Sequence, residues 1–462
     1  MLHDPVPTLL ARATEQLEEQ FASLPPFETA VDTAALAKVL EATAHRLADN
    51  YPYFHPLYAG QMLKAPHPVA RAAYALAMSI NPNNHARDGG RASSEMEIEA
   101  VREIAGMFAW SEFLGHLTSG GTFANLEALW IAVQLAPSMR IVGSEQAHYT
   151  HQRISAVLKL DYASIPTDHR GRMSLDALEA ELRKGDVGTV VVTMGTTAIA
   201  AVDPLDEILA LREKYKFRVH VDAAYGGYFR LISESLDDPA RRAFAVIGQA
   251  DSIVIDPHKH GLQPYGCGCV LFRDPAVGRF YKHDSPYTYF TSKQLHLGEI
   301  SLECSRAGAA ATALWATQQL LPLVPEGEFA CGLAKGRSAA GELDRRLRQD
   351  QAGRFQPLVA GPPELDIVVW KMNAVGPEEA SARAQEIFVA CATRNLHLAL
   401  VQLPQSWFEP SGPEQSKLEP ESRKAGGTGT GLVTCLRSVL MKPEHEAWLD
   451  SIWERLTAAC AG

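Results

Sequence analysis

A chain of 462 residues is too long for one small core, so we expect a large domain with smaller partners. Hydrophobic residues make up 46% of the chain and charged residues 21%, which is typical of a folded globular protein and excludes a disordered one. The formal net charge of −11 argues against a nucleic-acid-binding surface, because such surfaces are usually basic.

The first residues and the cysteines favour a cytoplasmic protein. MLHDPVPTLLARATEQLEEQF lacks the basic and continuous apolar regions of a signal peptide, and no apolar run approaches the roughly 18 residues of a membrane span. Seven widely spread cysteines do not predict a disulfide framework. Cys267 and Cys269 have no second ligand pair at metal-binding spacing, so we expect strand packing there and no metal.

The chain order of apolar patterns predicts the fold class. TAALAKVLEATAHRLADN predicts a helix over residues 33–50, and the proline-rich YPYFHPLYAG ends it. Farther along, helices alternate with short apolar runs, as in an α/β protein whose parallel sheet is covered on both faces. These runs are MRIVG, TVVVTMG, FRVHVDAA, DSIVIDP and GCVLFRD. DEILALREKYK, between the second and third runs, predicts a crossover helix.

The last third of the chain predicts a separate small domain. AKGRSAAGELDRRLRQD predicts a long helix, and ELDIVVWKMN and GLVTCLRSVLM predict strands, which together suggest an α+β domain. PSGPEQSKLEPESRKAGGTGTG is polar and predicts a surface excursion. We therefore expect a helical N-terminal segment at residues 1–70, a large domain at 71–320 and a small domain at 321–462.

Reactive side chains follow three of the predicted strands. Thr196 and Thr197 end one, Asp222 ends the next, and His258 and Lys259 end a third. Ligands of open α/β sheets bind at the carboxyl ends of the strands, so these side chains are predicted to meet in one crevice.

Two of these residues suggest covalent and electrostatic chemistry. A lysine directly after a buried strand can be partly desolvated and so suit a Schiff base, although a single lysine at such a place is more often a surface residue. Asp222 is followed by two alanines and, after Tyr225, two glycines, and a buried carboxylate there requires a cationic partner. That partner is either a protonated pyridine nitrogen or a buried arginine.

A phosphate site and a histidine complete the pattern. TSGGT, residues 118–122, precedes a strongly apolar helix, so free backbone N–H groups and hydroxyls lie at the positive end of a helix dipole. Simple N-capping would give the same local sequence. His148 follows the strand MRIVG, and a neutral imidazole there can lie flat against a ring or be an ordinary packed histidine. Together the four features match one ligand with a phosphate, a ring nitrogen and an aldehyde.

The order TSGGTxxN, SEQAHYT, GTT, HVDAAYGGYF, DPHKHG and SLECSRAGAAATALW resembles the group II pyridoxal-phosphate decarboxylases, the family of aromatic-amino-acid, glutamate and archaeal-type tyrosine/aspartate decarboxylases. The resemblance covers roughly residues 50–320, with a weaker similarity in LRSVLMKP. It implies fold type I, with a mostly parallel seven-stranded sheet, and a homodimer with shared active sites. It also implies that the chain uses pyridoxal 5′-phosphate to decarboxylate an L-amino acid to the amine, and so acts in amino acid metabolism.

The resemblance also implies roles for individual residues. Lys259 would hold the cofactor covalently and Asp222 would pair with its ring nitrogen. His148 and Ala224 would cover the two ring faces, and Thr197 would lie near the ring oxygen. The residues implied around the phosphate are Ser119, Gly120, Gly121, Thr122 and His258.

The remaining assignments concern the substrate. Within YKHDSPYTYFTSKQ, Tyr287 or Tyr289 would return a proton to the substrate, and we favour Tyr289. Arg437 is predicted to contact the substrate carboxylate, with an ordinary salt bridge as the alternative, and Arg306 is predicted to be structural. Asp256 stands where the animal members have asparagine, and the archaeal-type members have aspartate at this position as well.

Three alternative functions stay open at this point. The chain could be a carbon–carbon lyase of the sphingosine-phosphate type, although such enzymes need basic residues for a second phosphate. It could be a decarboxylating aldehyde synthase, although those have phenylalanine in place of the loop tyrosine. It could also be a non-enzymatic scaffold, although Lys259 and Asp222 are both present. Which amino acid is the substrate is left open, with residues 51–60 and 80–90 of a partner subunit predicted to line its pocket.

Overall fold

A computed structural model describes residues 6–27, 30–282, 300–409 and 431–461. Its helices are α1 (Val6–Glu19), α2 (Thr33–Leu47), α3 (Pro68–Met78), α4 (Arg91–Met107), α5 (Gly121–Leu135), α6 (Thr150–Val157), α7 (Leu175–Leu182), α8 (Leu205–Tyr215), α9 (Ala240–Ala245), α10 (Gly308–Leu320), α11 (Glu328–Arg348), α12 (Pro377–Ala392) and α13 (His445–Ala459). Its strands are β1 (Leu114–Thr118), β2 (Arg140–Ser144), β3 (Tyr162–Ile165), β4 (Val187–Thr193), β5 (Arg218–Asp222), β6 (Ser252–Ile255), β7 (Gly268–Phe272), β8 (Phe355–Pro357), β9 (Ile367–Met372), β10 (Ala399–Pro404) and β11 (Leu432–Val439).

The large sheet has seven strands in the order β1-β7-β6-β5-β4-β2-β3. Strands β3, β2, β4, β5 and β6 pair in parallel, whereas β7 runs antiparallel to both of its neighbours. The predicted α/β fold with a mostly parallel seven-stranded sheet is therefore confirmed. All seven residues of β4 and all four of β6 are buried, as continuous apolar runs require when helices cover both faces of a sheet.

The connections explain how the sheet is built. Helix α8 joins β4 to the parallel β5, so the predicted crossover helix is confirmed. The run GCVLFRD does form a strand, but this strand, β7, is antiparallel to β6. The two strands are joined by a connection of about a dozen residues without a crossover helix. Cys267 and Cys269 are buried in the core at the start of this strand.

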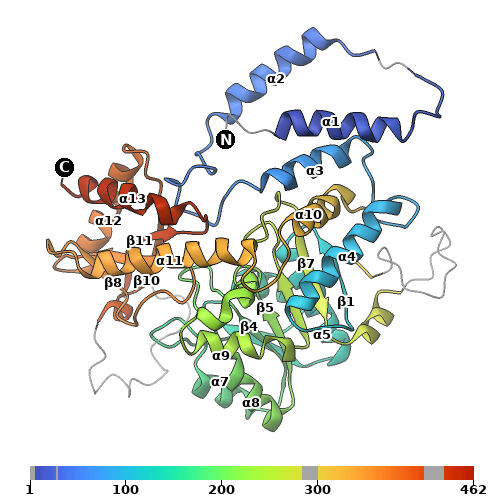
Figure 1. Cartoon of the computed structure of the whole chain (residues 1–462). Coiled ribbons are helices and arrows are strands. Elements are labelled where there is room, and N and C mark those ends of the chain that lie inside the picture. The colour runs from blue at the N-terminus through green and yellow to red at the C-terminus, as the bar shows by residue number, and fades with distance from the viewer. Residues whose placement is uncertain (1–5, 28–29, 283–299, 410–430, 462) are drawn as a thin grey trace.

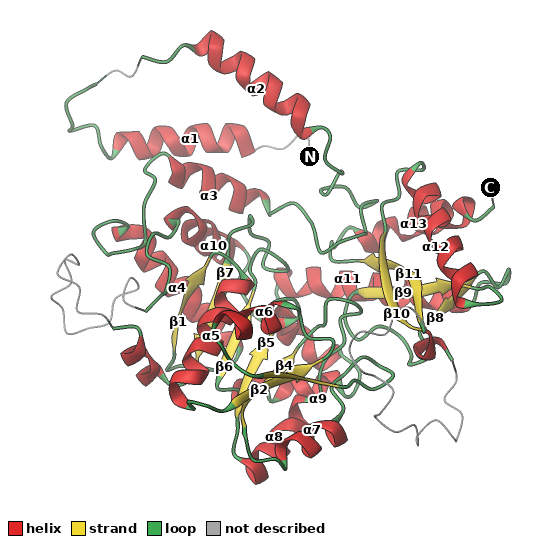
Figure 2. Ribbon diagram, turned by 180° about the vertical axis from the view of Figure 1, so that it is seen from behind, coloured by secondary structure: helices red, strands yellow, loops and turns green. Residues whose placement is uncertain are grey.

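The C-terminal part forms a second, smaller antiparallel sheet with the strand order β10-β11-β9-β8. Apolar side chains of α11, α12 and α13 bury its inner face in a separate core cluster. Figure 2 shows the two sheets apart from each other, with α11 running between them. The small α+β unit agrees with the sequence, while the domain limits at residues 70 and 320 stay predictions.

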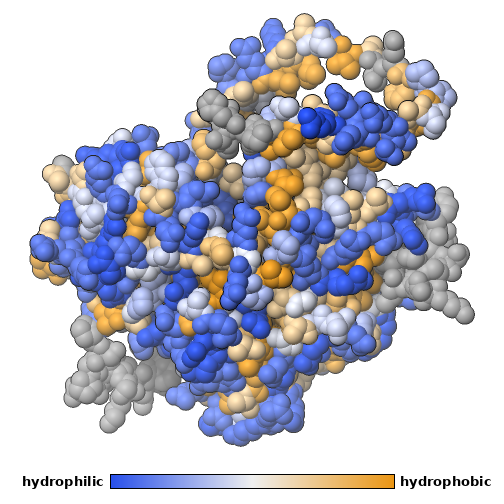
Figure 3. All heavy atoms as spheres, in the orientation of Figure 1, coloured by the Kyte–Doolittle hydropathy of each residue, from blue (hydrophilic) through white to orange (hydrophobic). Residues whose placement is uncertain are grey.

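The N-terminal helices α1 and α2 differ from the rest of the molecule because none of their side chains is buried. Figure 1 shows α2 standing away from the body of the protein, and Figure 3 shows apolar side chains on this exposed arm. The chain then returns to the body: Tyr58 bridges to His397 of the small unit, and α3 packs on α10. None of the described helices has the length and the apolar character that a membrane span requires.

Candidate active site

A cavity of about 430 Å³ lies at the edge of the large sheet where the parallel strands end. It collects the ends of β4, β5 and β6 and the start of α5, as expected for a ligand site in an open α/β sheet. Its lining includes ten residues singled out in the sequence: Ser119, Gly120, Gly121, Thr122, His148, Thr197, Asp222, Ala224, His258 and Lys259. The structure therefore brings the four sequence motifs together around one space.

Lys259 lies in the turn after β6, and its ammonium group is held by a carboxylate. The Nζ atom is 3.1 Å from Oδ2 of Asp256, and the Lys259 side chain is 22% exposed. The turn itself is closed by the Lys259 N–H, which donates to the Asp256 carbonyl. The lysine is thus neither a free surface residue nor fully buried, and its amine reaches the cavity.

Asp222 ends β5, between Thr193 of β4 and Val254 of β6, and is 5% exposed. Its Oδ2 accepts a hydrogen bond from Nε2 of His151 at 2.7 Å, and its Oδ1 accepts one from the Ala224 N–H at 3.1 Å. Burial alone would raise the pKa of Asp222, but the hydrogen bond and the charge of His151, followed by the charge of Lys259, outweigh it and hold the pKa below its usual value. The carboxylate is therefore an anion, and the side chain that pairs with it within the described structure is a histidine rather than an arginine.

A row of buried polar groups supports Asp222 from the other side. Asn125 of α5 donates to Asp222 Oδ2 at 3.4 Å, and its own Oδ1 lies 2.8 Å from Nε2 of His220. Nδ1 of His220 lies 2.9 Å from the Ser252 hydroxyl. Burial lowers the pKa of His220 to about 3, so this histidine is neutral. A neutral His220 must then donate to Asn125 Oδ1 and accept from the Ser252 hydroxyl. This fixes which group donates and which accepts in each hydrogen bond of the row.

The start of α5 is the segment predicted to hold the phosphate, and it is called the cradle below. Gly120 has φ +156°, and Gly121 opens the helix so close to Asp256 that a Cβ atom there would lie 2.6 Å from Oδ2. The Ser119 N–H already donates to a carboxylate, Oε2 of Glu303, at 2.9 Å. The N–H groups of a first helical turn have no partner within the helix, so the cradle offers donors to an anion.

Two histidines line the cavity above and beside the cradle. Burial lowers the pKa of His148, so its ring is neutral near pH 7, and its Nδ1 accepts a hydrogen bond from the Thr150 N–H. His258 lies next to Asp256, with 3.5 Å between Nε2 and Oδ2, and burial lowers its pKa as well. Both rings can therefore face a ligand without adding a positive charge.

Other predicted site residues lie outside this lining. Arg437 of β11 is 4% exposed and donates to the carbonyl oxygens of Thr197 and Ala198 and to the side chain of Gln61, so its guanidinium holds backbone next to the cavity. Its contact with a substrate stays a prediction. Tyr287 and Tyr289 lie outside the described residues. Thr196 is fully buried and accepts from the Ala201 N–H.

Arg306 has the structural role expected from the sequence. It forms a buried ion pair with Glu97 of α4, and it also donates to the carbonyl oxygens of Leu117 and Asn84. These contacts tie the start of α10 to β1 and α4.

Three lining or supporting residues were missed in the sequence: His151, Asn125 and Asp256 in its role as the partner of Lys259. Asp256 and Lys259 are three positions apart, and their side chains meet only because the chain turns between them. His151 stands in the same SEQAHYTH segment as His148, and its position on α6 could have suggested a second inward histidine. Asn125 is the last residue of the pattern TSGGTxxN, but the sequence predicted no role for it.

The cavity fits pyridoxal phosphate on its own chemistry. Besides the cradle, three buried polar atoms of its lining have no hydrogen-bond partner within the described structure: Thr193 Oγ1, Asp256 Oδ1 and His258 Nδ1. Such orphaned groups are costly unless a ligand satisfies them. The cavity is therefore polar and is lined by the start of a helix, an anionic carboxylate and a lysine amine. These groups suit the phosphate, the ring nitrogen and the aldehyde of pyridoxal phosphate.

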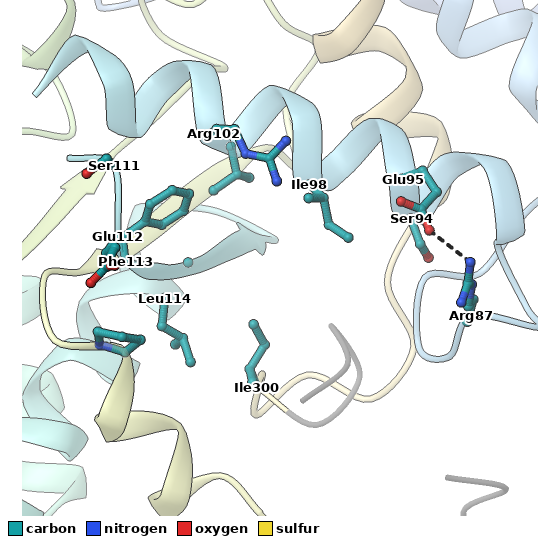
Figure 4. A pocket seen from close by; sticks show the side chains of 13 residues that line it. Arg87, Ser94, Glu95, Ile98, Arg102, Ser111, Glu112, Phe113, Leu114 and Ile300 are labelled. Atoms are coloured by element: carbon teal, nitrogen blue, oxygen red, sulfur yellow. Dashed lines mark ion pairs between the residues drawn. The ribbon is translucent and has the colours of Figure 1, made fainter. Parts of the chain in front are cut away.

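A larger cavity of about 580 Å³ lies between α4 and β1. Figure 4 shows Ile98, Leu114 and Ile300 pointing into it, with Arg87 and Glu95 paired at 3.4 Å on its edge. None of the residues that line it is among the catalytic or cofactor-binding residues predicted from the sequence. The smaller cavity at the sheet edge is therefore the candidate active site.

Comparisons with known proteins agree with this geometry. Residues 127–321 match a family model described as the pyridoxal-dependent decarboxylase conserved domain. A probable L-tyrosine/L-aspartate decarboxylase of Methanoculleus marisnigri is 31% identical over 345 residues, covering 74% of this chain and 86% of that protein. An L-tyrosine decarboxylase of Enterococcus faecium is 29% identical over 388 residues, covering 62% of this chain and 64% of that protein. The crystal structure of mouse CSAD has a TM-score of 0.76 at 20% identity, covering 96% of this chain and 91% of the other, and so shares the fold.

Proposed function

The chain belongs to the pyridoxal-dependent decarboxylase family and is a pyridoxal-phosphate-dependent amino acid decarboxylase, and on this premise we propose that its substrate is an aromatic L-amino acid, with L-tyrosine as the first candidate. The names of the two relatives support tyrosine, and one of them also names aspartate, which is the second candidate. The observation that carries the proposal is the single cavity lined by Lys259, Asp222 and the start of α5.

The residues divide the work of holding the cofactor. We propose that residues 119–122 bind the phosphate through their hydroxyls and through their backbone N–H groups other than that of Ser119, which donates to Glu303. We also propose that Asp222 pairs with the protonated ring nitrogen and that the Lys259 amine forms the covalent link. His148 is neutral because burial lowers its pKa. It can therefore cover one ring face without competing with the ring nitrogen for the negative charge of Asp222. Ala224 is small enough to let the ring approach from the other face.

When bound, pyridoxal phosphate supplies an electron sink for the electron pair that is released when the bond between Cα and the carboxylate breaks. The chain's contribution is electrostatic: the Asp222 anion lies in a buried site, where its pairing with a cationic ring is stronger than in water. Lys259, whose amine reaches the cavity, would hold the cofactor covalently. Tyr289, which lies outside the described residues, is our candidate for returning the proton to Cα.

We propose that the protein works as a homodimer. The exposed side chains of α1 and α2 and of the segment after α1 include Leu9, Phe21, Leu24, Phe27, Leu36, Val39 and Leu40. An exposed apolar surface of this kind favours association, and helices that bury none of their side chains gain little stability from their own chain. A second copy would cover this arm. Light scattering coupled to size-exclusion chromatography tests the dimer, and a monomer would contradict it.

Cytoplasmic residence is also part of the proposal. Each of the seven cysteines is unpaired, as is usual for proteins of a reducing compartment. Cell fractionation followed by immunoblotting tests this, and recovery in a secreted fraction would contradict it.

The substrate is tested by incubating the holoprotein with a panel of L-amino acids and identifying the products by mass. The proposal predicts tyramine and carbon dioxide from L-tyrosine, in equal amounts. An aldehyde in place of the amine would indicate an aldehyde synthase. Turnover of L-aspartate but not of any aromatic amino acid would overturn the aromatic assignment.

A further inference from the structure

We propose that His151 is a positioning residue for the decarboxylase reaction, which fixes the orientation and the negative charge of Asp222 for the ring nitrogen of pyridoxal phosphate. The inference rests on the proposed function, because that function makes Asp222 the partner of the ring nitrogen. His148 and His151 are both in the SEQAHYTH segment, but only His148 lines the cavity. His151 acts from behind the carboxylate, through Asp222.

The geometry of the pair is that of a strong hydrogen bond. His151 is the second residue of α6, its side chain is 0% exposed, and its Nε2 lies 2.7 Å from Asp222 Oδ2. Hydrogen bonds to an ionised acceptor are shorter and about twice as strong as neutral ones. The bond requires a proton on Nε2, since a carboxylate can only accept.

The second ring nitrogen of His151 shows which of its two ring protons the site can use. Nδ1 is buried, and no hydrogen-bond partner for it exists among the described residues. A proton on Nδ1 would be a buried donor without an acceptor, which is unfavourable. The proton on Nε2, which Asp222 accepts, is therefore the ring proton of His151 that the described surroundings satisfy.

The remaining contacts leave one face of the carboxylate available. Oδ2 of Asp222 is taken by His151 and, at 3.4 Å, by Asn125, whereas Oδ1 has a single donor, the Ala224 N–H. Each carboxylate oxygen has two lone pairs, so Oδ1 retains acceptor capacity. Because Asp222 lines the cavity, this capacity is directed at a ligand there.

The experiment compares His151→Leu, His151→Gln and Ser155→Ala with the wild type. Ser155 is a matched control because it lies on the same helix, is buried and has a hydroxyl without a partner. Three quantities are measured: the dissociation constant for pyridoxal phosphate by titrating apoprotein, the visible absorption band of the bound cofactor, and the melting temperature of apo and holo forms. A hydrogen bond to a charged group corresponds to about a tenfold to hundredfold change in affinity.

We expect His151→Leu to weaken cofactor binding by about tenfold to a hundredfold and to shift the absorption band. His151→Gln, whose amide can still donate to Asp222, recovers most of the affinity, and Ser155→Ala matches the wild type. If His151→Leu binds the cofactor with unchanged affinity and spectrum, and only melts earlier in both forms, His151 is merely structural and the inference is wrong.

Two further outcomes keep the test decisive. If His151→Leu does not fold, His151→Asn replaces it, because its shorter side chain carries the same amide but does not reach Asp222. Equal affinity of the Asn and Gln variants would then overturn the inference. Failure of the wild type to bind pyridoxal phosphate would overturn the proposed function and this inference together, whereas failure of the variants alone to differ would overturn only the inference.

Discussion

The ammonium group of Lys259 lies 3.1 Å from Oδ2 of Asp256, so the amine that is expected to hold the cofactor is held by a carboxylate from the same turn. Asp256 is 3% exposed, and Lys259 is its ion-pair partner at the shortest distance. Removing one partner of a buried pair leaves an uncompensated charge. The pair therefore couples the stability of the site to the lysine that is proposed to hold the cofactor.

This coupling predicts that Lys259→Ala lowers the free energy of unfolding of the apoprotein by about 3 kcal/mol. The double variant Lys259→Ala/Asp256→Asn is expected to regain most of that loss, because the buried charge is gone as well. Both variants are expected to lack decarboxylase activity. Urea denaturation of the apo forms checks the prediction, and equal stability of the single and double variants would argue against a coupled pair.

Asp222→Asn is expected to lower kcat by about a hundredfold to several thousandfold. The variant removes the anion opposite the ring nitrogen, and the loss of one partner of a buried pair is worth about 3–5 kcal/mol. Exposed Asp161 gives the control variant Asp161→Asn, which should match the wild type. Steady-state kinetics with the substrate found in the panel checks this, and an Asp222→Asn enzyme with wild-type kcat would exclude the assigned role.

Gly268→Ala is expected to weaken binding of pyridoxal phosphate at least tenfold. A Cβ atom on Gly268 would lie 2.5 Å from the carbonyl carbon of Gly120, so the backbone of the phosphate cradle would have to move. Gly106 of α4 has nothing within 4 Å of such an atom, so Gly106→Ala is a control that should leave cofactor binding unchanged. Titration of the apo forms decides, and unchanged affinity for Gly268→Ala would place the phosphate elsewhere.

His445 is expected to make the protein acid-sensitive. Burial, with the charge of Lys442 second, lowers the pKa of His445 to about 3. The unfolded chain takes up a proton near pH 6.5 while the folded one does not, so stability is complete above that pH and is lost as the pH falls towards 3. The loss amounts to about 1.4 kcal/mol per pH unit for one group. His445→Gln should lose less stability between pH 6.5 and pH 4 than wild type, whereas exposed His45→Gln should not differ from it.

Much of the fold follows from local sequence, because a strand buried on both faces needs a continuous apolar run. Strands β2, β4, β5 and β6 were predictable for this reason, and so was the meeting of their polar ends at one edge. The direction of β7 was not, since an antiparallel buried strand has the same composition as a parallel one. Strand β1 includes a glycine and a histidine and gave no clear strand pattern.

The inner layer of the site depends on packing that local sequence does not encode. His151 and Asp222 are 71 residues apart, and their contact arises only when α6 lies against the end of β5. The row from Asn125 through His220 to Ser252 likewise joins three separate elements. The residues proposed to meet the cofactor were thus predictable from motif order, whereas those that hold them in place required the three-dimensional structure.

The most direct test of the central claim is to reduce the holoprotein with borohydride and map the cofactor by peptide mass spectrometry. The reduction makes the lysine–cofactor bond permanent, so its position can be read from the peptides. The added mass is predicted on the peptide that contains Lys259 and nowhere else, and it should be absent from Lys259→Ala. Cofactor found on another lysine, or no added mass on a protein that turns over its substrate, would contradict the account.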